Sequence, residues 1–387
     1  MIYLRGGRKL SLSYSEIQKL KAIAQNFQIA EGEITHVIQV NSGRINSSYK
    51  ITVTQEDDTV SYMLQKINRH VFSNVDNVIN NALLITKHLR NKGMETLEYV
   101  YTKKKQPYFR GADGDYRMTK FIHAEIFQNV TRPKDMFNLG YAVGQFAVGL
   151  SDFKASKLVD TIPNFHNTRV RYENLLASAI ANANQAFFSG HEVRSKINVG
   201  RSHSATKELL FAYKHREEYG AIVDAINCKA IPLRVTHNDT KLNNVLFDRK
   251  TNVPRCLIDL DTVMSGSVLY DIADAIRSGA NTKSEDSKSL NNIMIDLELA
   301  EEFLKGFAQG APGMLTKKEI ELLPLAIKII PIELGMRYLT DYFDGDVYFG
   351  IVNEDDNYNR AKVQFALAED ISEHMDEITK IVKEVFA

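Results

Sequence analysis

Three short runs near the N-terminus alternate apolar and polar residues, and this pattern most constrains what the chain can fold into. The runs are ITHVIQV (34–40), SSYKITVT (47–54) and VSYMLQKI (60–67), and turn-rich sequences separate them. Alternation with a period of two residues is typical of half-buried strands. A fourth strand is expected at 116–122, directly after the turn sequence GADGD. The first part of the chain therefore predicts a small sheet.

Helical periodicity replaces this alternation in most of the remaining chain. One helix is expected before the strands (15–28) and one between the third and fourth strands (74–91). Further helices are expected at 134–151, 170–187, 204–226, 296–309, 316–343 and 360–386. A composition of 44% hydrophobic and 25% charged residues is typical of globular proteins. We expect an α+β protein with a β-rich lobe at 1–122 and a mainly helical lobe at 123–387.

Charge and hydropathy argue against several classes of protein. Lys and Arg together number 48, as do Asp and Glu, so the basic footprint of a general nucleic-acid binder is missing. The N-terminal sequence lacks an apolar signal core, and Lys328 and two prolines interrupt the longest apolar stretch, 322–332. The two cysteines form no C-x-x-C motif, which favours a reducing compartment. We expect a cytoplasmic protein that binds neither nucleic acid nor a membrane.

A cluster of polar residues surrounds one further strand pair in the helical part. The sequence VTHNDTKLNNVLFD begins at residue 235, and IDLD follows at 258–261. The segments NVLFD and RCLIDL are both strand-like, and RKTNVP between them reads as a turn. A turn centre between residues 251 and 252 places Asn244 opposite Asp259 in an antiparallel pair. Asp239 lies in the loop that enters the same end, so three oxygen-bearing side chains are expected to converge.

This set of side chains suits phosphoryl transfer. A carboxylate and an amide oxygen together suit Mg²⁺, which prefers hard oxygen ligands and keeps part of its water shell for phosphate. Asn244 and Asp259 are therefore candidate metal ligands. Asp239 is left for another task, and Lys241 can carry positive charge towards a phosphate. The alternative is that these residues only cap turns, as Asp and Asn often do.

The motif H-x-D-x-K-x-x-N followed by I-D resembles the catalytic loop and metal-binding aspartate of protein kinases. Asn238 replaces the usual arginine and D-L-D replaces D-F-G, a version typical of the aminoglycoside phosphotransferase and choline kinase superfamily. The runs YMLQKIN, FHNT and ELGMRYLTDYFDGDVYF further resemble the N-acetylhexosamine 1-kinases of that superfamily. The resemblance extends from about residue 30 to the C-terminal helix. It implies a two-lobed protein-kinase-like fold and ATP- and Mg²⁺-dependent phosphorylation of the anomeric hydroxyl of GlcNAc or GalNAc.

The resemblance also implies roles for single residues. Asp239 matches the catalytic base, and Asn244 and Asp259 match the metal ligands. The segment containing Phe121, His123 and Glu125 matches the hinge where backbone groups meet adenine, and Gly43 lies in the phosphate-covering loop NSGRIN. The expected sugar contacts are Arg44, Arg337 and Tyr348. The family commonly has a histidine where Arg44 stands, so Arg44 could instead bind phosphate or reshape the sugar site.

Two departures from the kinase pattern leave alternatives open. The phosphate-covering loop has one glycine, and Gln65 stands where kinases have a strand lysine, with Lys66 on the opposite face. We expect ATP to be held mainly by the metal, this loop and Lys241. The expected partners are a sugar and ATP, with no obligate protein partner. Alternatives are a kinase of the same fold for another hexose, a choline-like amino alcohol or an aminoglycoside, and a non-catalytic pseudokinase.

Other polar residues of this region have structural interpretations beside functional ones. His237 could be catalytic, but it is expected rather to brace the loop through hydrogen bonds, and Asp271 and Asp274 are expected to cap a helix or brace the loop. Arg277 is the expected ion-pair partner of these aspartates. Asp261 could be a second metal ligand, a sugar contact or a structural residue.

Overall fold

The computed structural model describes residues 12–40, 45–56, 58–188 and 200–387, and the chain divides into two compact units. The first unit comprises Met1–Ile126 and Leu246–Asp261, and the second comprises Phe127–Val245 and Thr262–Ala387. The chain therefore passes from one unit to the other three times. The lobe boundary expected after residue 122 stays a prediction.

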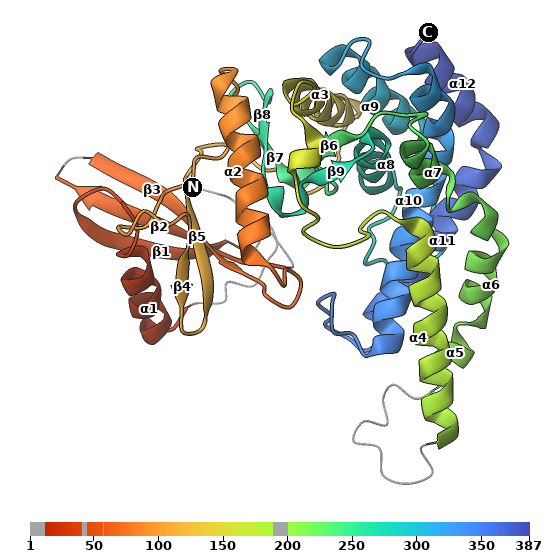
Figure 1. Cartoon of the computed structure of the whole chain (residues 1–387), viewed down its shortest axis with the longest axis horizontal. Helices are drawn as coiled ribbons and strands as arrows, with labels where there is room; N and C mark the ends of the chain where they lie inside the picture. The colour runs from red at the N-terminus through yellow and green to blue at the C-terminus, as the bar shows by residue number, and fades with distance from the viewer. Residues whose placement is uncertain (1–11, 41–44, 57, 189–199) are drawn as a thin grey trace. The chain divides into compact units, whose positions relative to one another are not determined.

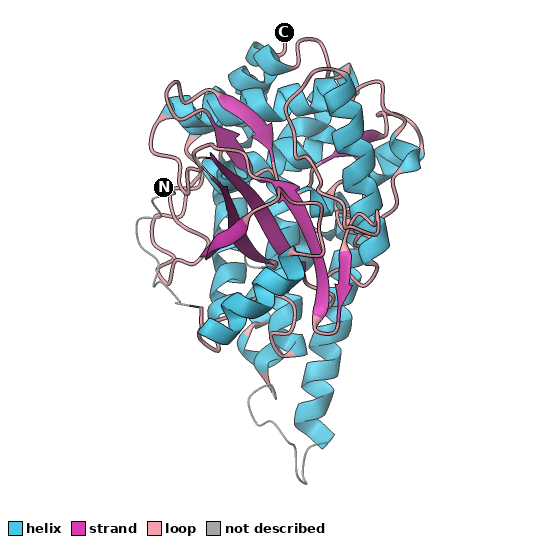
Figure 2. Cartoon of the chain, turned by 90° about the vertical axis from the view of Figure 1, so that its left-hand side faces the viewer, coloured by secondary structure: helices cyan, strands magenta, loops and turns pink. Residues whose placement is uncertain are grey.

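A five-stranded sheet forms the centre of the first unit (Figures 1 and 2). Its strands are β1 (Glu33–Val40), β2 (Ser47–Gln55), β3 (Asp58–Ile67), β4 (Phe109–Gly111) and β5 (Gly114–Lys120). They lie in the order β1-β2-β3-β5-β4, and every neighbouring pair is antiparallel. The three N-terminal strands predicted from alternation are confirmed. The strand expected at 116–122 begins and ends two residues earlier, because Gly111 pairs with Gly114 across a tight turn.

Among its described residues, two helices complete this unit. Helix α1 (Tyr14–Ala24) begins after Ser13, whose side chain accepts from the backbone N–H of Glu16 in a capping box. Its apolar residues pack on one face of the sheet, against Ile51, Val53 and Leu64. Helix α2 (Val75–Asn91) begins after Asn74, whose side chain accepts from the backbone N–H of Asn77 without a reciprocal capping box.

A second strand pair belongs to the first unit although it follows some 120 residues later in the chain. Strands β7 (Val245–Phe247) and β8 (Pro254–Leu257) form a two-stranded sheet. Leu246 and Cys256 from this hairpin pack with Ala124, and Ile122, Ile126 and Ile258 cover them. The backbone of Glu125 also pairs with that of Phe247 at 2.8 and 2.9 Å. The hairpin thus extends the hydrophobic core just after β5.

The second unit is mainly helical (Figure 1). Its longer helices are α3 (Pro133–Gly149), α4 (Thr168–Phe188), α8 (Val268–Gly279), α9 (Leu297–Gly310), α10 (Lys317–Asp344), α11 (Asp356–Glu373) and α12 (Met375–Val385). Short elements are η1 (Ala155–Lys157), α5 (Arg201–Ser204), α6 (Thr206–Lys214), η2 (Arg216–Glu218), α7 (Ala221–Asn227), β6 (Arg234–Thr236), η3 (Leu242–Asn244), η4 (Leu260–Thr262), which ends in this unit, and β9 (Met264–Gly266). The predicted helices at 134–151, 170–187, 296–309 and 316–343 are confirmed.

Two predicted helices are broken in the structure. The helix expected at 204–226 is divided into α5, α6, η2 and α7, and the helix expected at 360–386 is divided at His374 into α11 and α12. No proline marks these breaks, so periodicity alone runs through them. At the first break the hydroxyl of Tyr219 turns back to donate to the carbonyl of Ala212 at 2.7 Å. The shape of the core, rather than local sequence, therefore ends these helices.

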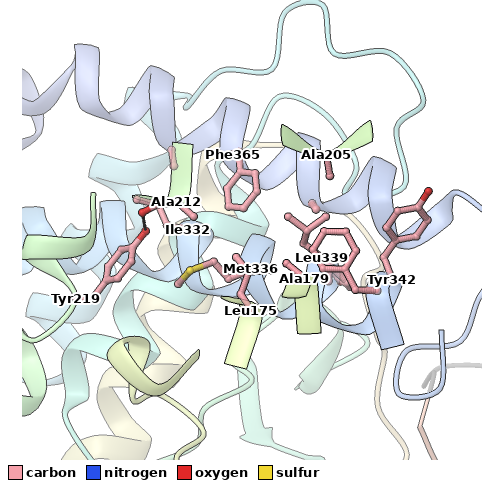
Figure 3. Packing of buried hydrophobic residues seen from close by; sticks show 14 residues of the cluster. Leu175, Ala179, Ala205, Ala212, Tyr219, Ile332, Met336, Leu339, Tyr342 and Phe365 are labelled. Atoms are coloured by element: carbon pink, nitrogen blue, oxygen red, sulfur yellow. Dashed lines mark hydrogen bonds between the residues drawn. The ribbon is translucent and has the colours of Figure 1, made fainter. Parts of the chain in front are cut away.

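The largest helix, α10, forms the centre of a buried cluster (Figure 3). Ile332, Met336 and Leu339 of α10 pack with Leu175 of α4 and Phe365 of α11. The helix begins with a capping box between Thr316 and Glu319 and ends at Gly345, whose φ of 97° is left-handed. This helix carries residues of the candidate site, so its packing determines where they lie.

Helices α3 and α9 approach each other through glycines, which leads to a prediction about stability. A Cβ atom added at Gly140 would overlap the carbonyl oxygen of Phe303 and lie 2.8 Å from the backbone nitrogen of Phe307. Backbone atoms cannot move aside as a side chain can. We expect Gly140→Ala to lower the free energy of unfolding by about 3 kcal/mol, despite the better helix propensity of alanine. Urea unfolding followed by circular dichroism measures this change.

The matched control is Gly350→Ala. No atom lies within 4 Å of a Cβ added at Gly350, and its φ is not left-handed. We expect a change within about 0.5 kcal/mol. Equal stabilities for the two variants would contradict the close packing of α3 on α9.

Two further sequence expectations concern cysteines and membrane spans. Cys228 and Cys256 are both free thiols. Among the helices of the described residues, none combines the length and apolarity needed to cross a bilayer.

Candidate active site

Three residues of the predicted catalytic loop, all in the second unit, lie in direct contact with one another. Lys241 Nζ lies 2.9 Å from Oδ1 of Asp239. The Nδ2 atom of Asn244 donates to Oδ2 and to the backbone carbonyl of Asp239, both at 2.8 Å. Asp239 therefore has one carboxylate oxygen paired with a cation and the other with an amide. Its side chain remains 27% exposed and is therefore accessible from solvent.

The loop before Asp239 is held by helix α8. Both carboxylate oxygens of Asp271 accept backbone hydrogen bonds, from His237 at 2.8 Å and from Asn238 at 2.7 Å. Asn238 adopts a left-handed φ of 64°, which Asn tolerates better than most residues. The Nδ1 atom of His237 accepts from the backbone N–H of Asp239 at 3.3 Å. These contacts give His237 and Asp271 the bracing geometry expected from the sequence.

A second aspartate of α8 holds the residues after Asp239. Asp274 accepts from the backbone N–H of Thr240 at 2.9 Å and forms a buried ion pair with Arg277 at 2.7 Å. Burial disfavours the charged form of Lys241, but Asp239, Glu285 and Asp274 outweigh it and raise its pKa. Lys241 therefore stays positively charged at neutral pH. It offers a fixed cation beside Asp239.

Asp271 gives the site a testable pH dependence. The residue is 2% exposed, and burial raises its pKa to about 6 although His237 and the two backbone N–H groups favour its charge. The unfolded value is about 4, so the folded state binds more protons between these two values. This contribution to stability is complete below about pH 4 and is lost as pH rises through about 6. We expect it to lower the free energy of unfolding by about 2–3 kcal/mol across that window.

Urea unfolding at a series of pH values measures this effect. Asp271→Asn removes the titrating group. The free energy of unfolding of this variant should therefore not fall between about pH 4 and 6 in the way described, whatever its overall stability. The same slope in both proteins between about pH 4 and 6 would contradict the assignment.

The hairpin register differs from the one expected. The backbone N–H of Asp248 donates to the carbonyl of Val253 at 2.9 Å, which places the turn centre one residue earlier, between residues 250 and 251. Asn244 lies in the short helical turn η3 rather than in a strand, and Asp259 follows the end of β8. The direct pairing of these two residues in a ladder is therefore wrong. Their joint role as metal ligands stays a prediction.

The residues present fit a magnesium ion in their chemistry. The Nδ2 atom of Asn244 is used by Asp239, so Oδ1 is the atom that Asn244 can offer to a cation. Asp259 supplies a carboxylate from a residue with a left-handed φ of 62°. Across the described residues, no three His, Cys, Asp or Glu side chains are grouped as a metal site. Mg²⁺ commonly uses one or two protein ligands with phosphate and water, so it does not require such a group.

The first unit contains a buried cation that the sequence analysis missed. Arg117 of β5 forms an ion pair with Asp261, and both side chains are 3% exposed. Gln65 accepts from Nε of Arg117 at 2.9 Å, whereas Lys66 points to the other face and donates to Asp113 at 3.2 Å. The expected placement of Gln65 and Lys66 on opposite faces is confirmed. The sequence feature that could have indicated Arg117 is a charged residue within a predicted strand. The structure shows this strand to be buried on both faces.

The predicted nucleotide-hinge residues follow β5. The rings of Phe121 and His123 make an edge contact at 5.2 Å, and Lys50 Nζ lies 4.4 Å from the centre of the Phe121 ring. Burial, with the nearby charge of Lys50, lowers the pKa of His123. Both backbone groups of Glu125 pair with Phe247, so a nucleotide contact at Glu125 would need its side chain. Gly43 and Arg44 lie outside the described residues.

Two of the three predicted sugar-contacting residues, Arg337 and Tyr348, come together in the second unit. The guanidinium of Arg337 lies 4.4 Å from the ring centre of Phe165 and 5.9 Å from that of Tyr348. Asp341 accepts from the backbone N–H groups of Val347 and Tyr348 at 2.8 and 2.7 Å and so holds the loop after α10. Arg337 and Tyr348 therefore form one cluster with Phe165.

This cluster continues towards the predicted catalytic loop through Glu333 and through His166 of the FHNT run. Glu333, on α10, is bonded to Nδ1 of His166 at 2.7 Å and accepts from Thr168 at 2.6 Å. Nε2 of His166 is buried without a hydrogen-bond partner, and its ring stacks on Tyr270. Burial works against the charge of Asp274, but Arg277, followed by Lys241 and His166, lowers its pKa. His166 therefore lies between the Arg337 cluster and the catalytic loop.

Comparison with known proteins places this architecture among phosphotransferases. A sequence model of the phosphotransferase enzyme family, APH, matches residues 36–311. An aminoglycoside phosphotransferase from Alicyclobacillus acidocaldarius is similar with a TM-score of 0.59 at 15% identity, covering 94% of this chain and 96% of that one. Spectinomycin phosphotransferase, in complex with ADP and spectinomycin, has a TM-score of 0.59 at 14% identity, covering 93% and 98%. Choline kinase from Cryptosporidium parvum Iowa II has a TM-score of 0.55 at 15% identity, covering 96% and 100%. The predicted α+β, two-lobed kinase-like fold is confirmed.

Proposed function

This chain belongs to the phosphotransferase enzyme family, and from that premise we propose that it is an ATP- and Mg²⁺-dependent kinase for the 1-hydroxyl of N-acetylhexosamines. The observation that carries the proposal is the contact of Asp239 with both Lys241 and Asn244 in a loop held by Asp271. Phosphoryl transfer needs an oriented nucleophile and positive charge near the transferred group. This loop offers a group for each requirement.

Each residue has a distinct task in the proposed reaction. Asp239 orients the acceptor hydroxyl and accepts its proton, a contribution of about 10²–10⁴-fold. Lys241 places positive charge where the phosphoryl oxygens pass, and Asn244 and Asp259 would hold Mg²⁺ on the nucleotide. When bound, the ion neutralises developing charge on the phosphates. Phe121 and His123 would meet the adenine, and the ADP complex of the spectinomycin phosphotransferase supports nucleotide use.

The charge of the acceptor region favours a neutral acceptor over a cationic one. Burial and the charge of Arg337 lower the pKa of Arg171 to about 10, so both residues carry positive charge at neutral pH. Asp341 is used by the backbone of the following loop, and Asp346 pairs with Arg201 at 2.6 Å. Of the three acidic residues in this region, Asp341 and Asp346 are thus already paired within the protein, and Asp344 is exposed. An aromatic ring such as Tyr348 suits the C–H face of a sugar.

Identification of the phosphorylated atom tests the proposal. The protein is incubated with MgATP and a panel of GlcNAc, GalNAc, neutral hexoses, choline and aminoglycosides, and products are analysed by phosphorus–proton correlation NMR. We expect phosphate on C1 of an N-acetylhexosamine. Phosphorylation of choline or an aminoglycoside alone would contradict the acceptor, and MgATP binding without any product would favour the pseudokinase alternative.

A further inference from the structure

The ion pair between Arg117 and Asp261 has no task in the reaction described so far. Both side chains are buried to the same extent, at 3% exposure. Two charges are costly to remove from water unless their remaining polar atoms are also satisfied. The contacts of each partner therefore indicate what the pair holds in place.

A row of hydrogen bonds across three strands supports Arg117. Gln65 lies opposite Arg117 in the β3–β5 ladder, and Ser48 lies opposite Gln65 in the β2–β3 ladder. Gln65 accepts from Arg117 at 2.9 Å and donates to Oγ of Ser48 at 3.0 Å. Their sequence neighbours Leu64 and Met118 belong to the opposite, apolar face that packs on α1. The hydrogen bonds of this row therefore hold the guanidinium group of Arg117 in one orientation on the polar face of the sheet.

Asp261 is held from a second direction as well. Its Oδ2 atom accepts from Nδ2 of Asn46 at 2.5 Å, while Oδ1 pairs with Arg117. Asn46 directly precedes β2, and its own Oδ1 accepts from the backbone N–H of Asn68 at 3.0 Å. One carboxylate therefore ties the segment after β8 to β5 and to the start of β2.

Asp259 belongs to the same group of charges. It stands two residues before Asp261, outside regular structure and with a left-handed φ. Burial works against the charge of Arg117, yet Asp261 and Asp259 together with Tyr99 raise its pKa. Burial, with Asp261 and Asp259, also raises the pKa of Tyr99 to about 12. Asp259 therefore lies on the short segment between the end of β8 and the anchored carboxylate of Asp261.

We propose that Arg117, acting through Asp261, is a positioning residue that orients Asp259 towards the metal–nucleotide complex. The inference rests on the proposed function, because it takes Asp259 as a metal ligand. Protein kinases use an ion pair of a strand lysine with a helix glutamate to order the nucleotide site. Here the buried cation stands on β5 beside Gln65, and its partner belongs to the segment that carries Asp259.

The test measures how much Mg²⁺ strengthens nucleotide binding. Affinity for a non-hydrolysable ATP analogue is determined with Mg²⁺ and with EDTA. The ratio of the affinity with Mg²⁺ to the affinity with EDTA is then compared between variants. Partial unfolding lowers both affinities alike, so the ratio reports on positioning. Residues that orient a metal ligand typically contribute 10–100-fold to affinity. We expect Arg117→Met and Asp261→Asn each to reduce the ratio about 10–100-fold.

Three further variants separate positioning from structural support. Arg117→Met combined with Asp261→Asn leaves no unpaired buried charge, so stability should return towards wild type while the ratio stays low. Arg117→Lys keeps the charge but lacks the rigid fork that reaches both Gln65 and Asp261, so it should restore the ratio only in part. Arg110→Met, which breaks an exposed ion pair with Asp76 in the same unit, should leave the ratio unchanged.

The outcomes distinguish this inference from the proposed function. If the double variant has the wild-type ratio, the Arg117–Asp261 pair only supports the structure, and the inference is overturned. If the wild-type protein instead binds the nucleotide equally well with Mg²⁺ and with EDTA, Mg²⁺ plays no part in nucleotide binding. The proposed function itself would then fail.

Discussion

Asp239→Asn should lower kcat about 10²–10⁴-fold while nucleotide affinity stays nearly unchanged. The amide cannot accept the proton of the acceptor hydroxyl. It also offers one acceptor oxygen in place of two, so it keeps the bond to Lys241 or to Asn244 but not both. The cost in stability should be about 1 kcal/mol. Steady-state kinetics, nucleotide titration and thermal unfolding together measure these changes.

The matched control for this variant is Asp248→Asn. Asp248 caps the hairpin turn, where its Oδ1 accepts from the backbone of Lys250 and Thr251 at 3.0 and 2.9 Å. The exchange has the same chemistry at a residue outside the proposed machinery, so kcat should stay within about twofold. Turnover near the wild-type rate in Asp239→Asn would exclude Asp239 as the catalytic base.

Asp259→Ala is expected to abolish most of the effect of Mg²⁺ on nucleotide binding. A direct ligand should contribute more than a residue that only orients one, so the loss should reach at least about 100-fold. Alanine also disfavours the left-handed φ of 62°, which costs about 1–2 kcal/mol of stability. Isothermal titration with the nucleotide, with and without Mg²⁺, measures the first effect, and urea unfolding measures the second.

Asn252→Ala provides the backbone control for that experiment. Asn252 has a similar left-handed φ of 55° in the hairpin turn and no proposed role at the site. It should reproduce the loss of stability while leaving the effect of Mg²⁺ intact. If Asp259→Ala behaves in the same way as this control, Asp259 is not a metal ligand.

Features that depend on local sequence could be predicted well. Alternation identified the strands β1, β2 and β3 to within two residues, because each strand buries one side. Asp239, Lys241 and Asn244 lie within six consecutive residues, so the motif alone brought them together. The breaks at 204–226 and at His374 could not be predicted, because packing between helices sets them.

Contacts that depend on strand register could not be predicted from the sequence. Arg117 and Asp261 are 144 residues apart, and their contact requires the ladder of three strands and the turn after β8. The pairing of Asn244 with Asp259 failed for the same reason, since a shift of one residue in the turn alters every opposed pair. The cluster of Arg337 with Phe165 joins α10 to a loop some 170 residues earlier, which no local pattern predicts.

The hairpin of β7 and β8 limits how this protein can be divided or recombined. A fragment ending at Ile126 would expose Ile122 and Ala124, because the side chains that cover them arrive with Leu246 and Cys256. A chimaera that exchanges the N-terminal unit with a relative must therefore transplant residues 246–261 together with residues 1–126. Exchanging the first segment alone would pack Leu246 and Cys256 against residues of another sequence in this apolar cluster.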